Sequence, residues 1–129
     1  ALPEYVHHVI FLGGANDILQ GRRIEDISRD YKRVLEWCEE KQYSLCVVLP
    51  FISTEQALNR QLLNLRQEAE HICGGKVFLL DLQPAIGMDA GARFKAYVDG
   101  IHPKSQTYEA MGSYAAPLIW KWLKNEKEA

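Results

Sequence analysis

The sequence has 129 residues, of which 47% are hydrophobic and 25% are charged, and its formal net charge is −2. This length and composition are ordinary for a globular protein, so we expect one domain over residues 1–129 with a packed core. No basic block rich in aromatic residues is present, which argues against nucleic-acid binding. No apolar run approaches the roughly 18–20 residues of a membrane span. The three cysteines have the spacing of neither a zinc site nor a disulfide framework, so they predict buried thiols and slightly favour the cytoplasm; they are Cys38, Cys46 and Cys73.

The chain is predicted to begin with a strand and a helix. Val6–Leu12 is a largely apolar run, which is typical of a strand that is covered on both faces. A helix is predicted over Arg23–Lys41, because apolar residues recur there at spacings of three and four while charged residues occupy the other positions. Its apolar stripe consists of Ile24, Ile27, Tyr31, Val34, Leu35 and Cys38.

The same alternation continues through the middle of the chain. Leu45–Leu49 predicts a second strand, and Thr54–Cys73 predicts a second helix that Gly74-Gly75 ends. Val77–Leu82 predicts a third strand. The apolar stripe of the second helix consists of Leu58, Leu62, Leu65, Ala69 and Ile72.

A last helix is predicted from Ser105, which we interpret as its N-cap, to the fraying tail Asn125–Ala129. Pro117 is expected to kink this helix or split it in two, because proline removes a backbone donor and clashes with the preceding turn. The residues expected to face inward are Tyr108, Met111, Ala115, Leu118, Ile119 and Trp122.

Strands that alternate with helices in this order predict an α/β fold, in which three parallel strands form a flavodoxin-like sheet layered with helices. Functional residues in such folds lie at the carboxyl ends of the strands. The segments expected at that end are Gly13–Asp17, Pro50–Thr54, Asp81–Met88 and Asp99–His102.

The predicted strand Val6–Leu12 has an unusual position. Three strands in sequence order place it at an edge of the sheet, although its sequence is apolar on both faces. An exposed, flat, apolar edge strand is prone to pair with another chain. We therefore expect Val6–Leu12 to pair with an upstream segment or with a second copy of the chain in a homodimer.

Two short motifs carry chemistry. The first is Gly13-Gly14-Ala15-Asn16-Asp17, which follows the first strand, and the second is Asp99-Gly100-Ile101-His102-Pro103, which precedes the last helix. A histidine is the commonest general base, a carboxylate can hold its tautomer, and a side-chain amide can stabilise an oxyanion. Serine-type acyl hydrolysis needs these three parts and a nucleophile. Either motif alone also fits a turn or a helix cap, but their joint presence favours a functional site.

These two motifs resemble the Asn block and the D-x-x-H block of the SGNH hydrolases, also called GDSL-type esterases and lipases. The resemblance implies that His102 is the base and Asp99 orients it, while Asn16 donates to the oxyanion and Gly14 shapes the Asn loop. It also implies a small acyl-ester substrate and no metal or organic cofactor. A metal site at His7-His8 is not expected either, because adjacent strand residues point to opposite faces.

The chain departs from the family pattern upstream of Asn16. The Gly-Asp-Ser block, which supplies the nucleophile, and the block with the second oxyanion donor are both missing from this sequence. We therefore expect the chain to represent the carboxyl-terminal part of the family fold, without its amino-terminal strands, and to be inactive as an isolated esterase. Ser53 and Asp17 are expected at the substrate rim, by which we mean the loops at the carboxyl ends of the strands. No nucleophile elbow surrounds Ser53.

Two other functions stay open at this point. The chain is an alternative candidate for a non-catalytic binding or assembly module, which keeps the family scaffold and pairs through its exposed edge strand. A third candidate is a flavodoxin-like domain that binds a flavin or a nucleotide, although neither a G-x-G-x-x-G nor a Walker pattern is present.

Overall fold

The structure, a computed structural model, describes residues 7–13, 17–18, 20–87, 89–99 and 102–128. Three parallel strands form one sheet in the order β1-β2-β3, with β1 at His8–Leu12, β2 at Ser44–Val48 and β3 at Phe78–Leu80. The predicted three-stranded parallel sheet is therefore confirmed, with strand ends that differ by one or two residues.

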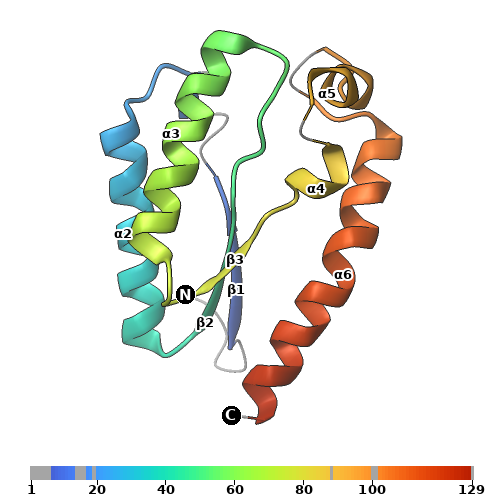
Figure 1. Ribbon diagram of the computed structural model, residues 1–129. Helices are drawn as coiled ribbons and strands as arrows, with labels where there is room; N and C mark the ends of the chain where they lie inside the picture. The colour runs from blue at the N-terminus through green and yellow to red at the C-terminus, as the bar shows by residue number, and fades with distance from the viewer. Residues whose placement is uncertain (1–6, 14–16, 19, 88, 100–101, 129) are drawn as a thin grey trace.

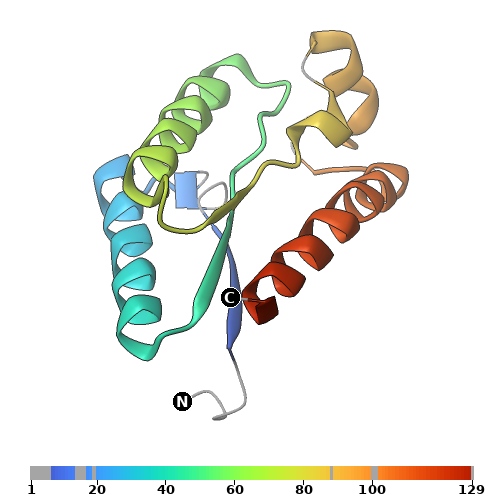
Figure 2. The ribbon, with the colours of Figure 1, turned by 60° about the horizontal axis from the view of Figure 1, so that its bottom comes forward.

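Long helices cover both faces of the sheet. The helices α2 (Ile24–Lys41) and α3 (Gln56–Cys73) lie on one face, and α6 (Ser105–Glu128) lies on the other (Figure 1). The turned view shows the same three layers (Figure 2). Two short helices, α4 (Gln83–Ile86) and α5 (Ala90–Ala96), lie toward the carboxyl ends of the strands. Among the helices of the described residues, none combines the length and the apolar character that crossing a membrane requires.

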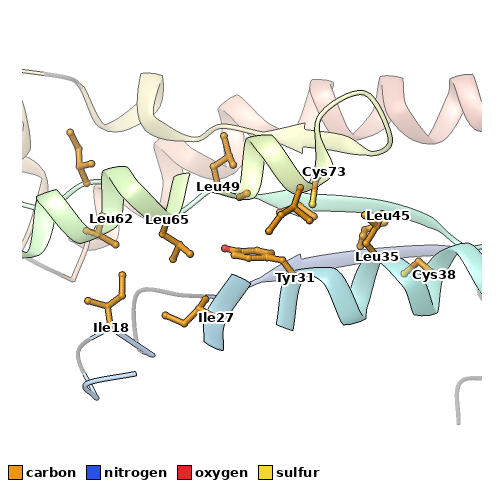
Figure 3. Packing of buried hydrophobic residues seen from close by; sticks show 14 residues of the cluster. Ile18, Ile27, Tyr31, Leu35, Cys38, Leu45, Leu49, Leu62, Leu65 and Cys73 are labelled. Atoms are coloured by element: carbon orange, nitrogen blue, oxygen red, sulfur yellow. The ribbon is translucent and has the colours of Figure 1, made fainter. Parts of the chain in front are cut away.

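The central strand β2 is buried on both faces, which explains its continuous apolar sequence. Leu45 and Val47 belong to the cluster between the sheet and the helices α2 and α3, whereas Cys46 and Val48 belong to the cluster beneath α6. Figure 3 shows the first cluster, in which the ring of Tyr31 lies between the helices and the sheet. All three cysteines are buried and free, as predicted.

The strand β1 lies at an edge of the sheet, as predicted. Val9 and Phe11 pack against the α2–α3 cluster, but Ile10 and Leu12, which alternate with them, are 52% and 64% exposed. Within the described residues, β1 pairs with β2 and with no other strand. The sheet therefore exposes an apolar strip along its β1 edge.

The last helix differs from the prediction in two ways. The helix α6 continues through Pro117, so the expected split does not occur. The reason is tertiary packing, because Ala115 and Trp122, on either side of Pro117, are both buried against the sheet. In addition, Ser105 is the first helical residue and not the N-cap, because the carbonyl of Lys104, the residue before it, accepts the first helical N–H groups.

A further expectation is wrong. Tyr108 does not face inward but is 54% exposed, because the first turn of α6 instead buries Thr107, whose hydroxyl donates to the carbonyl of Ala96 at 2.7 Å. The segment between β3 and α6, for which the sequence predicted no helix, contains α4 and α5. Both helices are too short to give a recognisable apolar period.

Candidate active site

The segment that carries the predicted acid and base is a short hairpin between α5 and α6. Tyr97 and Pro103 form an isolated antiparallel bridge. The N–H of Val98 donates to the carbonyl of His102 at 2.8 Å, and the N–H of Lys104 donates to the carbonyl of Ala96 at 2.9 Å. These backbone bonds hold the two arms of the hairpin in register.

The structure brings Asp99 and His102 together at the tip of this hairpin. Oδ2 of Asp99 lies 2.6 Å from Nδ1 of His102, and Oδ1 accepts the backbone N–H of His102 at 2.7 Å. A carboxylate at Nδ1 favours the imidazole tautomer with its proton on that nitrogen, which leaves the lone pair of Nε2 free to accept a proton. Among the described residues, Nε2 has no hydrogen-bond partner, and the His102 side chain is 66% exposed. The pair therefore has the geometry that a general base and its orienting carboxylate require.

The hairpin is attached to the loop that follows β2. The hydroxyl of Tyr97 donates to the carbonyl of Ile52 at 2.5 Å, and Nε of Arg93 donates to the carbonyl of Ser53 at 2.9 Å. Burial raises the pKa of Tyr97 to about 12, against the opposing effect of the Arg93 charge. These contacts place Asp99 and His102 at the carboxyl end of the sheet, which is where α/β folds carry functional residues.

The predicted oxyanion residues Gly14 and Asn16 lie outside the described residues. Gly13, at the start of their loop, is described, and its carbonyl accepts the hydroxyl of Tyr31 at 3.0 Å. The carboxylate of Asp17, at the other end of the loop, pairs with the guanidinium of Arg22 at 3.0 Å. Hydrogen bonds to Asp30 and Asp17 raise the pKa of Arg22.

Ser53, the other predicted rim residue, lies in the loop between β2 and α3. Its side chain is buried, its hydroxyl donates to Oδ1 of Asn59 at 3.1 Å, and the same hydroxyl accepts the N–H of Glu55 at 3.0 Å. Asn59 also accepts the N–H of Ser53 and donates to its carbonyl. No described contact joins Ser53 to His102, and an amide is not a general base. The geometry therefore makes Ser53 a structural residue that joins the loop after β2 to α3 through Asn59.

Several rim residues were not singled out from the sequence. Gln83, which is 1% exposed, accepts the N–H of Ile52 at 2.8 Å and donates to the carbonyl of Gly87 at 3.0 Å. Arg66 donates twice to Asp81, at 3.1 and 2.8 Å, and once to the carbonyl of Pro50. Their position at the end of a predicted strand was the available signal for Asp81 and Gln83, but nothing in the sequence indicates which groups they reach.

The electrostatics of Asp81 follow from these contacts. Burial alone would raise the pKa of its carboxyl. The hydrogen bonds from the Arg66 side chain and from the backbone N–H of Gln83, together with the charge of Arg66, instead lower this pKa below its usual value. Asp81 is therefore ionised at neutral pH, and it holds Arg66, which in turn binds the Pro50 carbonyl in the loop after β2.

A cavity of about 720 Å³ lies elsewhere, at the amino ends of β2 and β3. Ser44, Lys76 and Trp122 are among its lining residues. Neither Asp99 nor His102 contributes to it.

The described residues also contain no cluster of three or more His, Cys, Asp or Glu side chains that could hold a metal ion. His8 packs edge-on against Trp122, with the ring centroids 5.0 Å apart.

Comparisons with known proteins give one family and several similar structures. The sequence profile of the GDSL-like lipase/acylhydrolase family matches residues 2–110. A G-D-S-L family protein from Desulfitobacterium hafniense DCB-2 has 20% identity and a TM-score of 0.74, with 88% of this chain and 66% of that chain covered. A GDSL-like lipase from Bacteroides thetaiotaomicron has 16% identity and a TM-score of 0.76, with 89% and 62% covered.

A third similar structure is a psychrotrophic esterase from Pseudoalteromonas sp., inhibited by monoethylphosphonate, with 16% identity and a TM-score of 0.67. Here 92% of this chain and 63% of that chain are covered. The chain thus spans less than two thirds of each of these proteins, and the likeness shows that they share its fold. No curated protein matches the sequence.

Proposed function

The chain belongs to the GDSL-like lipase/acylhydrolase family, and on that premise we propose that it forms part of a serine-type ester hydrolase, with His102 as the general base and Asp99 as its orienting carboxylate. The observation that carries this proposal is the 2.6 Å contact between Nδ1 of His102 and Asp99, in a hairpin held at the carboxyl end of the sheet. The substrate is a small ester of a carboxylic acid.

The chemistry follows from the orientation of the imidazole. As a serine hydroxyl attacks the ester carbonyl, Nε2 of His102 takes the hydroxyl proton, and the carboxylate of Asp99 stabilises the imidazolium that forms. The imidazolium then returns the proton to the leaving alcohol. The side-chain amide of Asn16 donates a hydrogen bond to the tetrahedral oxyanion, and Gly14 gives the loop the room for this. In another serine hydrolase, loss of one such oxyanion donor lowers kcat by about 10²–10³. The steps need neither a metal nor an organic cofactor.

The nucleophile of this proposal is not a residue of the 129-residue sequence. No Gly-Asp-Ser motif is present in the chain. The hydroxyl of Ser53 is occupied by Asn59 and Glu55. We therefore expect the isolated chain to leave aryl acetates unhydrolysed and to remain unlabelled by a fluorophosphonate probe. Efficient turnover by this chain, with labelling of Ser53, would show that the nucleophile has been misassigned.

The positive test supplies a serine. The chain is extended by any residues that its natural reading frame places before Ala1, and hydrolysis of aryl acetates is measured. The proposal expects hydrolysis that His102→Ala abolishes and that Asp99→Asn lowers by about 10⁴, as in the serine-protease precedent. His71→Ala is the matched control, because His71 is an exposed histidine on α3 and should leave the rate unchanged. An extended chain that hydrolyses esters equally well after His102→Ala would contradict the assignment of the base.

A second candidate function is favoured by the apolar strip on β1. Ile10 and Leu12 are more than half exposed on an edge strand, and edge strands of this kind add strands from other chains. On this alternative, the chain is a non-catalytic assembly module that pairs through β1. Its occupant is an upstream segment or a second copy of the chain.

A further inference from the structure

The hydroxyl of Tyr97 joins two parts of the rim that are 45 positions apart in sequence. Its acceptor, the carbonyl of Ile52, lies beyond the end of β2 and so outside the sheet ladder. The N–H of Ile52 is also satisfied by a side chain, through Oε1 of Gln83 at 2.8 Å. Tyr97, Ile52 and Gln83 are 3%, 7% and 1% exposed. Since buried peptide groups need hydrogen-bond partners, the Tyr97 hydroxyl and the Ile52 carbonyl are paired where water has little access.

This contact acts on one arm of the hairpin. Tyr97 lies on the arm that carries Asp99, and the bridge partner of Tyr97, Pro103, lies on the arm that carries His102. The carbonyl of Ala96, at the base of the hairpin, is held from the α6 side by Thr107 and Lys104. The arm with Asp99 is thus attached to the loop after β2 by the Tyr97 side chain, and to the arm with His102 by backbone bonds.

We propose that Tyr97 is a positioning residue for His102. Its bond to Ile52 holds the arm with Asp99 in place, and this keeps the carboxylate against Nδ1 of His102 and fixes the pair at the carboxyl end of the sheet. Loss of the hydroxyl leaves this arm held by the local bonds of the hairpin alone, so that the carboxylate selects one imidazole tautomer less strongly. The inference rests on the proposed function, because the position of His102 matters to a reaction in which it is the base.

The test uses the 129-residue chain and needs no enzymatic activity. With uniform ¹⁵N labelling, the shifts of Nδ1 and Nε2 of His102 are measured at a pH where the imidazole is neutral, and they give the fraction of the tautomer protonated on Nδ1. The urea-unfolded chain gives the reference fraction without the fold. We expect this fraction to be high in the wild type and to fall toward the reference in Tyr97→Phe, while the far-ultraviolet circular dichroism stays unchanged.

Tyr31→Phe is the matched control, because it too removes one buried phenol hydroxyl from a backbone carbonyl, that of Gly13. It should leave the His102 tautomer at the wild-type fraction. A Tyr97→Phe chain that keeps the wild-type fraction would overturn the positioning role and leave the Asp99–His102 pair intact. A wild-type fraction equal to the unfolded reference would instead contradict the proposed function, since the pair itself would be absent.

A second measurement decides the matter if Tyr97→Phe does not fold. In the wild type, a hydroxyl proton that is buried and bonded exchanges slowly enough with water to give its own resonance. A Tyr97 hydroxyl resonance with nuclear Overhauser effects to Ile52 would support the contact, and its absence at low temperature would overturn the inference.

Discussion

The hydroxyl of Tyr31 donates to the carbonyl of Gly13 across 3.0 Å, from the middle of α2 to the first residue after β1. Tyr31 is 1% exposed and packs edge-on against Phe11, with the ring centroids 5.4 Å apart. One buried side chain therefore anchors the start of the loop that leads to Asn16. Tyr97 makes the equivalent bond for the hairpin with His102, so that each of the two motif loops is held by a tyrosine.

Tyr31→Phe removes this anchor with little change of volume. We expect the free energy of unfolding to fall by about 1 kcal/mol, because the Gly13 carbonyl loses its donor in a partly buried place. Urea unfolding followed by circular dichroism measures the change. Tyr114→Phe on α6 is the control, since Tyr114 is at the surface, and a change there should stay within about 0.5 kcal/mol. Equal losses in the two variants would contradict an anchoring role for Tyr31.

Arg66→Met breaks the bidentate pair with Asp81 and the bond to the Pro50 carbonyl. We expect a loss of about 1–2 kcal/mol at pH 7, which is less than for a fully buried pair because the Asp81 side chain is 39% exposed. Arg60→Met is the control, since Arg60 is an exposed arginine on the same helix.

The same pair gives a prediction for acid pH. The folded-state pKa of Asp81 is lowered, so its stabilisation is fully present above the unfolded pKa of about 3.9 and is lost as the pH falls through the folded value. The difference in unfolding free energy between the wild type and Arg66→Met should therefore shrink below about pH 4. A difference that is constant from pH 7 to pH 2.5 would show that Asp81 contributes nothing to it.

At alkaline pH, the buried phenol of Tyr97 should become a source of instability. Its pKa is raised to about 12 by burial, above the ordinary value of 10.0, so its contribution is complete below about pH 10 and is lost as the pH rises toward 12. Relative to Tyr97→Phe, the wild type should lose about 1 kcal/mol by pH 11. Unfolding by urea at pH 9, 10 and 11 measures this loss, and tyrosinate absorbance identifies the ionisation. Parallel pH curves for the two proteins would refute the prediction.

The exposed strip on β1 predicts self-association of the 129-residue chain. Ile10 and Leu12 are exposed on β1, which pairs with β2 on one side and with no strand of the described residues on the other. We expect sedimentation velocity to show a concentration-dependent dimer, and the double substitution Ile10→Lys/Leu12→Lys to give a monomer, because lysines block edge pairing. Phe94→Lys, on α5, is the control, since Phe94 is 76% exposed but distant in sequence from β1. A monomeric wild type at all concentrations would count against the assembly function.

Local patterns predicted most of this fold because the long elements obey one physical rule each. The run Leu45–Leu49 is apolar throughout because β2 lies between two layers, and the stripe from Ile27 to Cys38 is periodic because α2 packs one side against the sheet. The pattern fails where tertiary packing decides. Pro117 lies within one continuous helix, and the first turn of α6 buries Thr107 where the sequence predicted Tyr108.

The candidate site divides in the same way. Asp99 and His102 are three positions apart, so their contact could be expected from the sequence alone. The bonds that set the hairpin against the rest of the rim join residues with no sequence relationship, such as Tyr97 with Ile52 and Arg93 with Ser53, which are 45 and 40 positions apart. Such pairings depend on how the layers pack, and no local propensity encodes them.

The hairpin from Ala96 to Lys104 is closed by its own backbone bonds, and the side chain of Tyr97, one of its residues, attaches it to the loop after β2. A designer who transplanted this hairpin onto another α/β scaffold would therefore have to provide a buried backbone carbonyl that accepts the Tyr97 hydroxyl.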